Sequence, residues 1–597
     1  MSHAAQNPLS LKQIRNPLLR GLIKKVSRVD VLERWYDDWL LDNSGQHGSS
    51  GAFLEYMLGR MNVDACGLDE ELLNSVPKQG PLVIVANHPL GGLEGMLLTK
   101  VLQALRPDVK VLANDLLKLI PEFDDVFIGV DVLNQGKQRE NARGMREAAR
   151  HLSGGGALLV FPAGTVSLMK LPSFTLSDAE WSPMVARLAR KYDAPIMPVF
   201  VEGRNSLAFY LSIYVHKRLR TLLLPRAMLS KGGASIPLRI GALIPAKEMQ
   251  RLSDDTVATE YIRLCSNVLQ TSAQEDEALE ALELSAIKQN VADDVVIKHV
   301  ESLSDCRIHT QKKISLYCVP YTRLGPVMEQ LAIERERTFR QVDEGTGKEL
   351  DTDRFDPNYK HLFLWDEDAQ KIAGGYRIGR SDEIVEEHTL DGLYSHSLFD
   401  YDKQFLKEIG KSIEVGRSFI TPEYQRHPSS LDMLWKGIGW FVMRNPEYHT
   451  VFGCVSISRQ YSRLATALLS ETLLSHYGAE EPHRRNIKAR TPIDTPKTPW
   501  TKPQLAKLSN ISVLNKLVGR IDSGKSIPIL IRHYLALNGR FGSFTLNNNF
   551  GQSVDGLIIV DLRKTSDKYL KRYMGHDGFE ELMAQWADPV LLSDQNS

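Results

Sequence analysis

The chain has 597 residues, 43% of them hydrophobic and 24% charged, and its 73 basic side chains balance its 73 acidic ones. A formal charge of zero argues against nucleic acid as a partner of the whole molecule, and the length predicts more than one domain. Five cysteines without metal-ligand spacing predict free or buried thiols in a reducing compartment and no metal site. Residues 1–13 lack the apolar core of a signal peptide, and no uncharged apolar run approaches the ~18 residues of a spanning helix.

Residues 1–50 are predicted to form a basic amphipathic segment. Between Leu9 and Leu41, lysines and arginines alternate with leucine, isoleucine and valine at helical spacing, and tryptophans follow. Helices of this type lie on anionic lipid. Residues 208–226 have the same character. For each segment two interpretations stay open, docking on a membrane surface or packing of an ordinary helix on the domain core.

The most informative stretch follows a short apolar strand predicted at residues 81–86. His88 comes directly after this strand, and Glu94 follows six residues later. An imidazole can accept a proton from a hydroxyl near neutral pH, and a carboxylate can hold the ring in one tautomer. The motif contains no serine or cysteine nucleophile, so the activated hydroxyl would belong to the substrate. A structural histidine beside a strand is the alternative interpretation.

Two further apolar strands are predicted at residues 157–161 and 195–201, and the first ends in a Pro-Gly turn. Together with the His88 block, this set resembles the glycerolipid acyltransferase superfamily over residues 77–246. The resemblance implies an α/β O-acyltransferase domain at residues 51–270, with His88 and Glu94 as catalytic residues. It also implies a set of substrate-binding residues: Asn87, Gly91, Gly92, Phe161, Pro162, Gly164 and Thr165.

Departures from the family pattern bear on the acceptor. The acid, Glu94, is a glutamate instead of an aspartate and stands one residue later than usual. Ala163 and Val166 replace a glutamate and an arginine that the family uses for a glycerol phosphate. The resemblance therefore implies acyl transfer to an acceptor other than glycerol 3-phosphate or lysophosphatidate.

A domain boundary is predicted at residues 271–304, a polar stretch with little glycine or proline that indicates a helical linker. Beyond it, residues 305–590 are predicted to form an α+β domain with a mixed sheet. Predicted strands cover residues 314–319, 361–365, 372–378, 412–420, 525–530 and 554–561, and predicted helices cover residues 327–340 and 430–443. Residues 483–503 are predicted to be a long loop, a candidate lid over an acyl groove.

This half resembles the GNAT superfamily, and within it the ornithine-lipid N-acyltransferases and the acyl-homoserine-lactone synthases. The residues that carry the resemblance are Arg335, Arg337, Phe339, Asp351, Asp353, Phe355, Asp356, the hairpin at 361–378 and the stretch from Glu414 to Ser418. The glycine-rich loop on which GNAT enzymes bind the coenzyme A pyrophosphate is absent. Arg426 stands there instead, as a candidate phosphate partner. The resemblance implies acyl carrier protein as donor and no cofactor.

Roles in this domain follow from the chemistry of an amine acceptor. Glu414 is predicted to act as a base or to position water, and the alternative is a structural ion pair with Arg417. Arg417 is also a candidate substrate-binding residue. Asp351, Asp353 and Asp356 are predicted to bind a cationic amino acid, and a solvated acidic loop is the alternative.

The order of the two domains resembles the bifunctional bacterial ornithine-lipid synthases. The resemblance implies that the second domain moves a 3-hydroxyacyl group from acyl carrier protein to ornithine, and that the first acylates the 3-hydroxyl of the lyso-ornithine lipid. It implies a peripheral location on the cytoplasmic face of the bacterial inner membrane. Alternatives are another amino acid (glutamine, lysine or glycine), a lipid-binding N-terminal half without activity, or a diffusible acyl-homoserine lactone.

Overall fold

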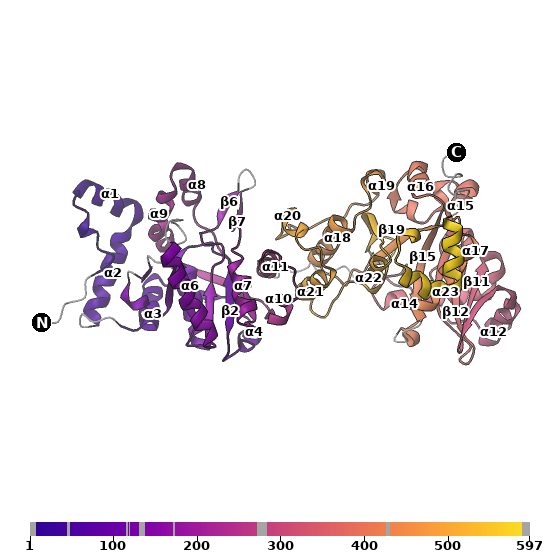
Figure 1. Ribbon diagram of the computed structural model, residues 1–597, viewed down its shortest axis with the longest axis horizontal. Coiled ribbons are helices and arrows are strands. Elements are labelled where there is room, and N and C mark those ends of the chain that lie inside the picture. The colour runs from indigo at the N-terminus through magenta and orange to yellow at the C-terminus, as the bar shows by residue number, and fades with distance from the viewer. Residues whose placement is uncertain are drawn as a thin grey trace. The chain divides into compact units, whose positions relative to one another are not determined.

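The computed structural model describes residues 7–43, 48–114, 117–118, 120–130, 138–170, 174–270, 283–425 and 430–587. The chain divides into two compact units (Figure 1). The N-terminal unit comprises residues 1–274 and 499–508, and the C-terminal unit comprises residues 275–498 and 509–597. The predicted boundary region contains the division, whereas the return of residues 499–508 to the N-terminal unit was not predicted.

The N-terminal unit is built on a seven-stranded sheet with the order β1-β9-β8-β2-β5-β3-β4. All neighbouring strands are parallel except β8 and β9. Every residue of β2 and β5 is buried, which explains their unbroken apolar sequences, since helices cover both faces of a parallel sheet. The strands are β1 Asp64–Cys66, β2 Leu82–Ala86, β3 Lys110–Asn114, β4 Phe127–Val130, β5 Ala157–Val160, β8 Ile196–Val201 and β9 Ser235–Ile240, with a hairpin of β6 Leu168–Lys170 and β7 Thr175–Ser177.

Helices surround this sheet, and the predicted amphipathic segments are among them. Residues 9–41 contain α1 and α2, and residues 208–226 lie in α8 and α9; α9 packs against both α1 and α8. The helices are α1 Pro17–Ser27, α2 Val29–Asp42, α3 Ser50–Met61, α4 Glu70–Asn74, α5 Gly92–Leu105, α6 Gln138–Ser153, α7 Met184–Lys191, α8 Leu207–Val215, α9 Lys217–Leu229, α10 Ala246–Gln250, α11 Asp255–Asn267 and, from the returning segment, α20 Lys502–Ala506.

The C-terminal unit contains an eight-stranded mixed sheet with the order β10-β11-β12-β13-β15-β16-β19-β18. Its one parallel pair is β15 with β16. The predicted hairpin is β12 and β13. The strands are β10 Arg307–Gln311, β11 Ile314–Pro320, β12 Lys360–Asp366, β13 Lys371–Arg380, β15 Ser412–Ile420, β16 Thr450–Ile457, β18 Arg540–Asn547 and β19 Ser553–Asp561, and a small ladder joins β14 Phe399–Asp400 to β17 Lys488–Ala489.

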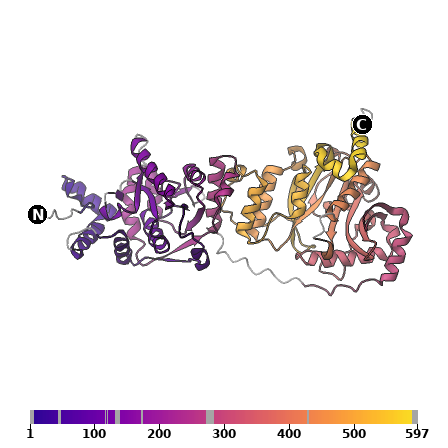
Figure 2. The same ribbon diagram turned by 60° about the horizontal axis from the view of Figure 1, so that its bottom comes forward.

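Helices pack on both faces of this sheet (Figures 1 and 2). Tyr317 and Phe363 share a core cluster with residues of α12 and α14, whereas Leu316 and Leu362 lie against Gly437 of α17. Successive residues of a strand point to opposite faces, so α14 and α17 cover opposite faces. The helices are α12 Asp293–Ser302, α13 Tyr321–Leu324, α14 Pro326–Arg340, α15 Ser381–His388, α16 Lys403–Ile409, α17 Ser430–Arg444, α18 Arg463–Tyr477, α19 Glu481–Arg485, α21 Ile511–Ile521, α22 Ile529–Ala536 and α23 Asp567–Trp586.

Two predicted elements differ from the structure. Residues 283–292 have no regular secondary structure, and α12, which follows them, packs on α14 inside the C-terminal unit, so the described part of the predicted linker is not a helical connector. Residues 525–530 form no strand, because Pro528 caps α22 and the chain turns into a helix there. Among the helices of the described residues, none combines the length and the apolar character needed to cross a membrane.

Candidate functional site

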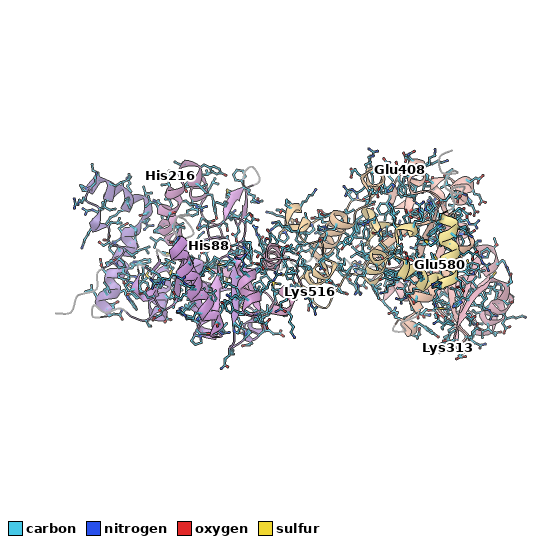
Figure 3. All side chains as sticks on the ribbon, viewed as in Figure 1. His88, His216, Lys313, Glu408, Lys516 and Glu580 are labelled. Atoms are coloured by element: carbon cyan, nitrogen blue, oxygen red, sulfur yellow. The ribbon has the colours of Figure 1, made fainter. Side chains whose placement is uncertain are left out.

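His88 and Glu94 form a close pair at the end of β2 in the N-terminal unit, where Figure 3 labels His88. Nδ1 of His88 lies 2.8 Å from Oε1 of Glu94. The carboxylate is fully buried, whereas 20% of the histidine side chain is exposed. A buried acid behind a partly exposed imidazole is the arrangement of a general base and its orienting partner, because the ring nitrogen not facing the acid stays available to a substrate.

The loop between the two residues is held by Glu94 itself. Oε1 of Glu94 accepts hydrogen bonds from the backbone N–H groups of Leu90 (3.0 Å) and Gly91 (2.9 Å) at the start of α5. Gly91 has φ +95°, and a Cβ atom there would lie 2.7 Å from the side chain of Leu224 on α9. Gly91 is therefore needed for the turn, and Gly92 begins α5.

The second predicted block lies against this pair. The ring of Phe161 is 4.7 Å from the ring of His88, between centroids. Gly164, with φ +64°, donates to the carbonyl of Phe161 and closes a tight turn that also contains Pro162 and the half-buried Thr165. The structure thus brings together the two blocks, which lie about seventy residues apart in the chain.

A residue that the sequence did not mark joins the two blocks. Asp178 accepts hydrogen bonds from the hydroxyl of Ser167 (2.5 Å), the indole of Trp181 (2.9 Å) and the backbone N–H of His88 (3.4 Å). The backbone N–H of Ser167 also donates to the carbonyl of His88 at 2.7 Å. No motif signals Asp178, since it belongs to neither block and follows the short strand β7.

Asn87 has a structural role instead of the predicted substrate contact. Its amide oxygen accepts from the N–H of Val201, at 2.6 Å, and its amide nitrogen donates to the carbonyl of the same residue, at 2.9 Å. The side chain is buried, and these two bonds hold the end of β2 beside the end of β8. Asn87 therefore places His88.

In the C-terminal unit, the parallel strands β15 and β16 separate part-way along their length. β15 and β16 pair with each other from Ser412 to Val415; beyond that point β15 stays paired with β13 and β16 with β19, but the two strands no longer pair with each other. Arg417 lies just beyond this point with φ +51°, an unusual conformation for a residue with a side chain. Strained backbone of this kind persists where surrounding contacts hold it, and Arg417 is held by several.

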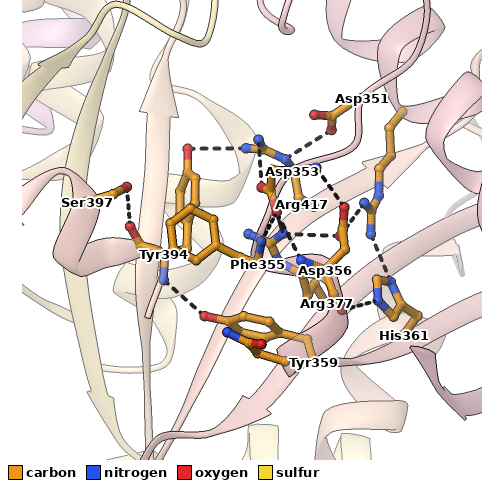
Figure 4. Close-up of polar contacts among 12 residues, drawn as sticks. Asp351, Asp353, Phe355, Asp356, Tyr359, His361, Arg377, Tyr394, Ser397 and Arg417 are labelled. Carbon is orange, nitrogen blue, oxygen red and sulfur yellow. Dashed lines mark hydrogen bonds and ion pairs between the residues drawn. The ribbon is translucent and has the colours of Figure 1, made fainter. Parts of the chain in front are cut away.

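Arg417 belongs to a buried network of alternating charges, the aspartate–arginine cluster (Figure 4). Each carboxylate in it is within 3.2 Å of a guanidinium nitrogen. In order of contact the cluster is Asp351, Arg417, Asp353, Arg377, Asp356 and Arg335. Three aspartates therefore alternate with three arginines inside the unit.

The cluster corrects the predicted acidic loop. The Asp351 and Asp356 side chains are at most 2% exposed, so they are not solvated. Burial raises the pKa of Asp356, but the charges of Arg335 and Arg377 outweigh it and hold this pKa below its ordinary value. Binding of a cationic amino acid stays a prediction, since both carboxylate oxygens of Asp351 lack a hydrogen bond among the described residues and burial raises the pKa of Asp351. The aspartates and arginines are otherwise paired within the cluster. Its effect is to fix Arg417.

His361 closes the other end of the cluster. Its Nδ1 lies 3.1 Å from a guanidinium nitrogen of Arg335, and its Nε2 lies 3.1 Å from the carbonyl of Asp356. Burial and the nearby Arg335 charge lower the pKa of His361 to about 3. The ring is therefore neutral, with Nδ1 accepting from Arg335 and Nε2 donating to the carbonyl.

Glu414 is placed differently from its prediction. It is 2% exposed, and its oxygens accept from the hydroxyl of Tyr359 and from the backbone N–H groups of Tyr394 (3.1 Å) and Ser395 (2.6 Å). The predicted ion pair with Arg417 is wrong, since Arg417 pairs with the aspartates. The Glu414 carboxylate therefore positions residues 394–395, and its role as a base stays a prediction.

Glu344 is a second residue that the sequence did not mark. It follows α14, is 9% exposed, and burial raises its pKa from 4.5 to about 8, against a hydrogen bond with Ser456 of β16. In the sequence it precedes a Gly-Thr-Gly turn and resembles an ordinary surface acid. The predicted phosphate partner Arg426 lies outside the described residues.

Comparison with known proteins agrees with this division of the chain. Residues 59–275 match the family model described as "Acyltransferase", and residues 335–436 match the one described as "Acetyltransferase (GNAT) domain". A glycine N(alpha)-acyltransferase of Phocaeicola vulgatus is 30% identical over 277 residues, covering 43% of this chain and 82% of that protein. The chain belongs to this family of N(alpha)-acyltransferases.

Further relatives of this acyltransferase match smaller parts of it. An L-ornithine N(alpha)-acyltransferase of Brucella abortus is 26% identical, covering 40% of this chain and 78% of its own length. A lyso-glycine lipid O-acyltransferase of P. vulgatus is also 26% identical, covering 32% and 69%. The predictions of an enzyme, of the two superfamilies and of the α/β plus α+β fold class are confirmed.

Proposed function

We propose that this acyltransferase makes a diacylated amino-acid lipid in two steps. The C-terminal unit transfers a 3-hydroxyacyl group from a carrier thioester to the α-amine: an amide bond forms, the C–S bond breaks, and the thiol receives the amine proton. The N-terminal unit then transfers a second acyl group to the 3-hydroxyl, whose proton passes through His88 to the leaving thiol. One observation carries the proposal: a single chain joins the His88–Glu94 pair to matches with both N- and O-acyltransferases.

Glycine is the proposed amino acid to test first, and ornithine is the second. Ornithine was implied by the order of the two domains, and the acidic cluster added a slight preference for a cationic amino acid. That added preference is weakened, because each aspartate of the cluster lies beside an arginine. The relative with 30% identity is named for glycine, and the ornithine enzyme of Brucella abortus is 26% identical. Glutamine and lysine remain further alternatives that the same experiment would identify by mass.

An acidic acyl carrier protein is the proposed donor. Arg143, Arg146 and Arg150 are exposed on α6 at a spacing that puts them along one face, and with Lys110 they line a cavity of about 540 Å³. The nearby acid Glu147 is already close to Lys110, at 3.9 Å. A positive surface of this kind accelerates encounter with an acidic protein.

A membrane surface is the proposed working place, on the cytoplasmic face of the bacterial inner membrane. Leu18 and Leu22 on α1 are 84% and 58% exposed, and Tyr214 and Val215 on α8 are 66% and 77% exposed. Both helices pack on α9, at the upper edge of the N-terminal unit in Figure 1. Exposed apolar side chains beside lysines and arginines favour docking on anionic lipid.

The test is mass spectrometry of lipids from a bacterial host without aminolipids that expresses the wild type or His88→Ala. The wild type should yield a diacylated amino-acid lipid whose head-group mass names the acceptor, and His88→Ala should accumulate the monoacyl amide. Arg187→Ala is the control, since this arginine lies on α7 of the same unit, pairs with Asp255 at 3.2 Å and does not line the cavity beside α6. Diacylated lipid from His88→Ala would refute the role of the N-terminal unit, and no new lipid from the wild type would refute the two-step scheme.

A further inference from the structure

A cavity of about 770 Å³ lies in the N-terminal unit next to the His88 site. Its walls come from the β6–β7 hairpin, α8, α11 and α20. The last of these belongs to residues 499–508, the returning segment, which overlaps the predicted lid at 483–503. The volume is that of a small-molecule site, in which a few placed polar groups set specificity.

Arg263 on α11 is the buried cationic group of this cavity. It is 8% exposed, and one guanidinium nitrogen donates to the carbonyl of Asp178 at 2.9 Å. Its Nε has no hydrogen-bond partner among the described residues. The neighbouring acid Glu260 is instead bound by Lys507 at 3.1 Å. A buried guanidinium with an unsatisfied N–H group is costly unless an anion meets it.

Asp178 connects Arg263 to the His88 site. The carboxylate of Asp178 accepts a hydrogen bond from the backbone N–H of His88 at 3.4 Å, and its backbone carbonyl accepts one from Arg263. In an N-(3-hydroxyacyl) amino acid the carboxylate carbon and the 3-hydroxyl oxygen are six bonds apart, roughly the 7 Å of two extended residues. Because Asp178 alone lies between His88 and the guanidinium of Arg263, we expect such a molecule to reach both residues.

The remaining wall provides a path for the acyl chain. Tyr214 of α8 lines the cavity and is also 66% exposed on the proposed membrane-facing side of the same helix. Ile213 and Met169 add apolar lining. A lipid with an apolar chain and one anionic end would therefore have its tail along α8 and its charge beside α11.

We propose that this cavity is the acceptor site for O-acyl transfer and that Arg263 binds the free carboxylate of the N-acyl amino acid. The inference rests on the proposed O-acylation step and names its substrate class. N-acylation removes the charge of the α-amine and leaves the carboxylate, so this anion is common to lyso-lipids of glycine and of ornithine. The carboxylate is absent from a thioester donor, so it distinguishes acceptor from donor.

The kinetic test compares N-(3-hydroxyhexadecanoyl)glycine with its methyl ester as acceptors, using the full-length wild type, Arg263→Gln and Arg263→Lys. We expect the wild type to prefer the acid by about 10- to 100-fold in kcat/KM, the value of hydrogen bonds to a charged group. Arg263→Gln should abolish this preference mainly through KM, and Arg263→Lys should keep part of it. Equal use of acid and ester by the wild type would overturn the proposal without any variant.

A control and a binding measurement separate the possible failures. Arg190→Gln is the matched control, because Arg190 on α7 is also partly buried, donates to the carbonyls of Met249 and Leu252, and does not line the cavity. It should leave the acid preference unchanged even if stability falls. Calorimetric titration of both compounds into the wild type reports on the site without turnover. Binding of the acid but not the ester, with no O-acylation, would refute the proposed function alone, whereas equal binding would refute the carboxylate site alone.

Discussion

Replacing Glu94 by glutamine separates its chemical role from its structural one. The amide oxygen of Glu94→Gln can still accept from the backbone of Leu90 and Gly91, which Oε1 of Glu94 now does at 3.0 and 2.9 Å. Two hydrogen bonds to a charged acceptor become neutral ones, so we expect a loss of about 2 kcal/mol in the free energy of unfolding. Without the negative charge, His88 is no longer stabilised when protonated, and the rate of O-acylation should fall by about 10²- to 10⁴-fold.

The assay measures O-acylation of an N-(3-hydroxyacyl)glycine by the full-length protein, together with denaturant unfolding of each variant. Glu122→Gln is the matched control, since this carboxylate is 3% exposed in the same unit and accepts from Tyr36 (2.6 Å) and Trp39 (3.0 Å). It should lose similar stability and keep its activity. Wild-type turnover in Glu94→Gln, or an equal loss in Glu122→Gln, would show that the pair does not act as a base and its partner.

Four other predictions concern pH, buried charge, membrane and donor. Burial raises the pKa of Glu344 from 4.5 to about 8, so its contribution to the free energy of unfolding is fully present below pH 4.5 and is lost as the pH rises to 8. In denaturant unfolding, Glu344→Gln should match the wild type at pH 4.5 and be more stable at pH 9 by on the order of a few kcal/mol. A difference in stability that does not depend on pH would refute this. Arg377→Met leaves its aspartate partners uncompensated and should lower the free energy of unfolding by about 3–5 kcal/mol, so a loss below about 1 kcal/mol would contradict the role of the cluster. Leu18→Asp should weaken sedimentation with anionic vesicles by about tenfold or more, whereas Ile529→Asp, on an exposed residue of α22 in the C-terminal unit, should not. Arg146→Glu should raise the KM for an acyl carrier protein, and equal KM values at low salt would exclude this docking surface.

The periodicity of the sequence predicted the sheets well because their strands are buried. β2, β5 and β8 are continuous apolar runs between two layers of helices, and β12 and β13 are separated by a short polar turn. The failure at 525–530 has a local cause. A short apolar run is compatible with strand or helix, and Pro528 provides the helix start that decided between them.

The return of residues 499–508 could not be predicted from the same patterns. α20 is held in the N-terminal unit by contacts distant in sequence: Gln504 and Lys507 both contact Glu260. Such contacts depend on which surfaces the folded units present, and a polar stretch rich in threonine and proline carries no sign of its destination. The cavity beside His88 was missing from the sequence analysis for the same reason.

The burial of each side chain explains which predicted site residues can contact a substrate. His88 is 20% exposed over a fully buried acid, so it can meet a substrate while the acid stays unhydrated. Asn87 and Glu414 have equally suitable side chains, but both are buried and bonded to backbone groups, and Glu414 also to the hydroxyl of Tyr359, so they stabilise the fold around the sites. Arg263 differs from both, since nothing in the sequence of α11 marks it as a site residue. Its guanidinium is nevertheless buried at a cavity, and its Nε has no hydrogen-bond partner among the described residues. Residue type and spacing indicate which chemistry a chain can perform. The polar groups that folding leaves without a hydrogen-bond partner indicate where a substrate can bind.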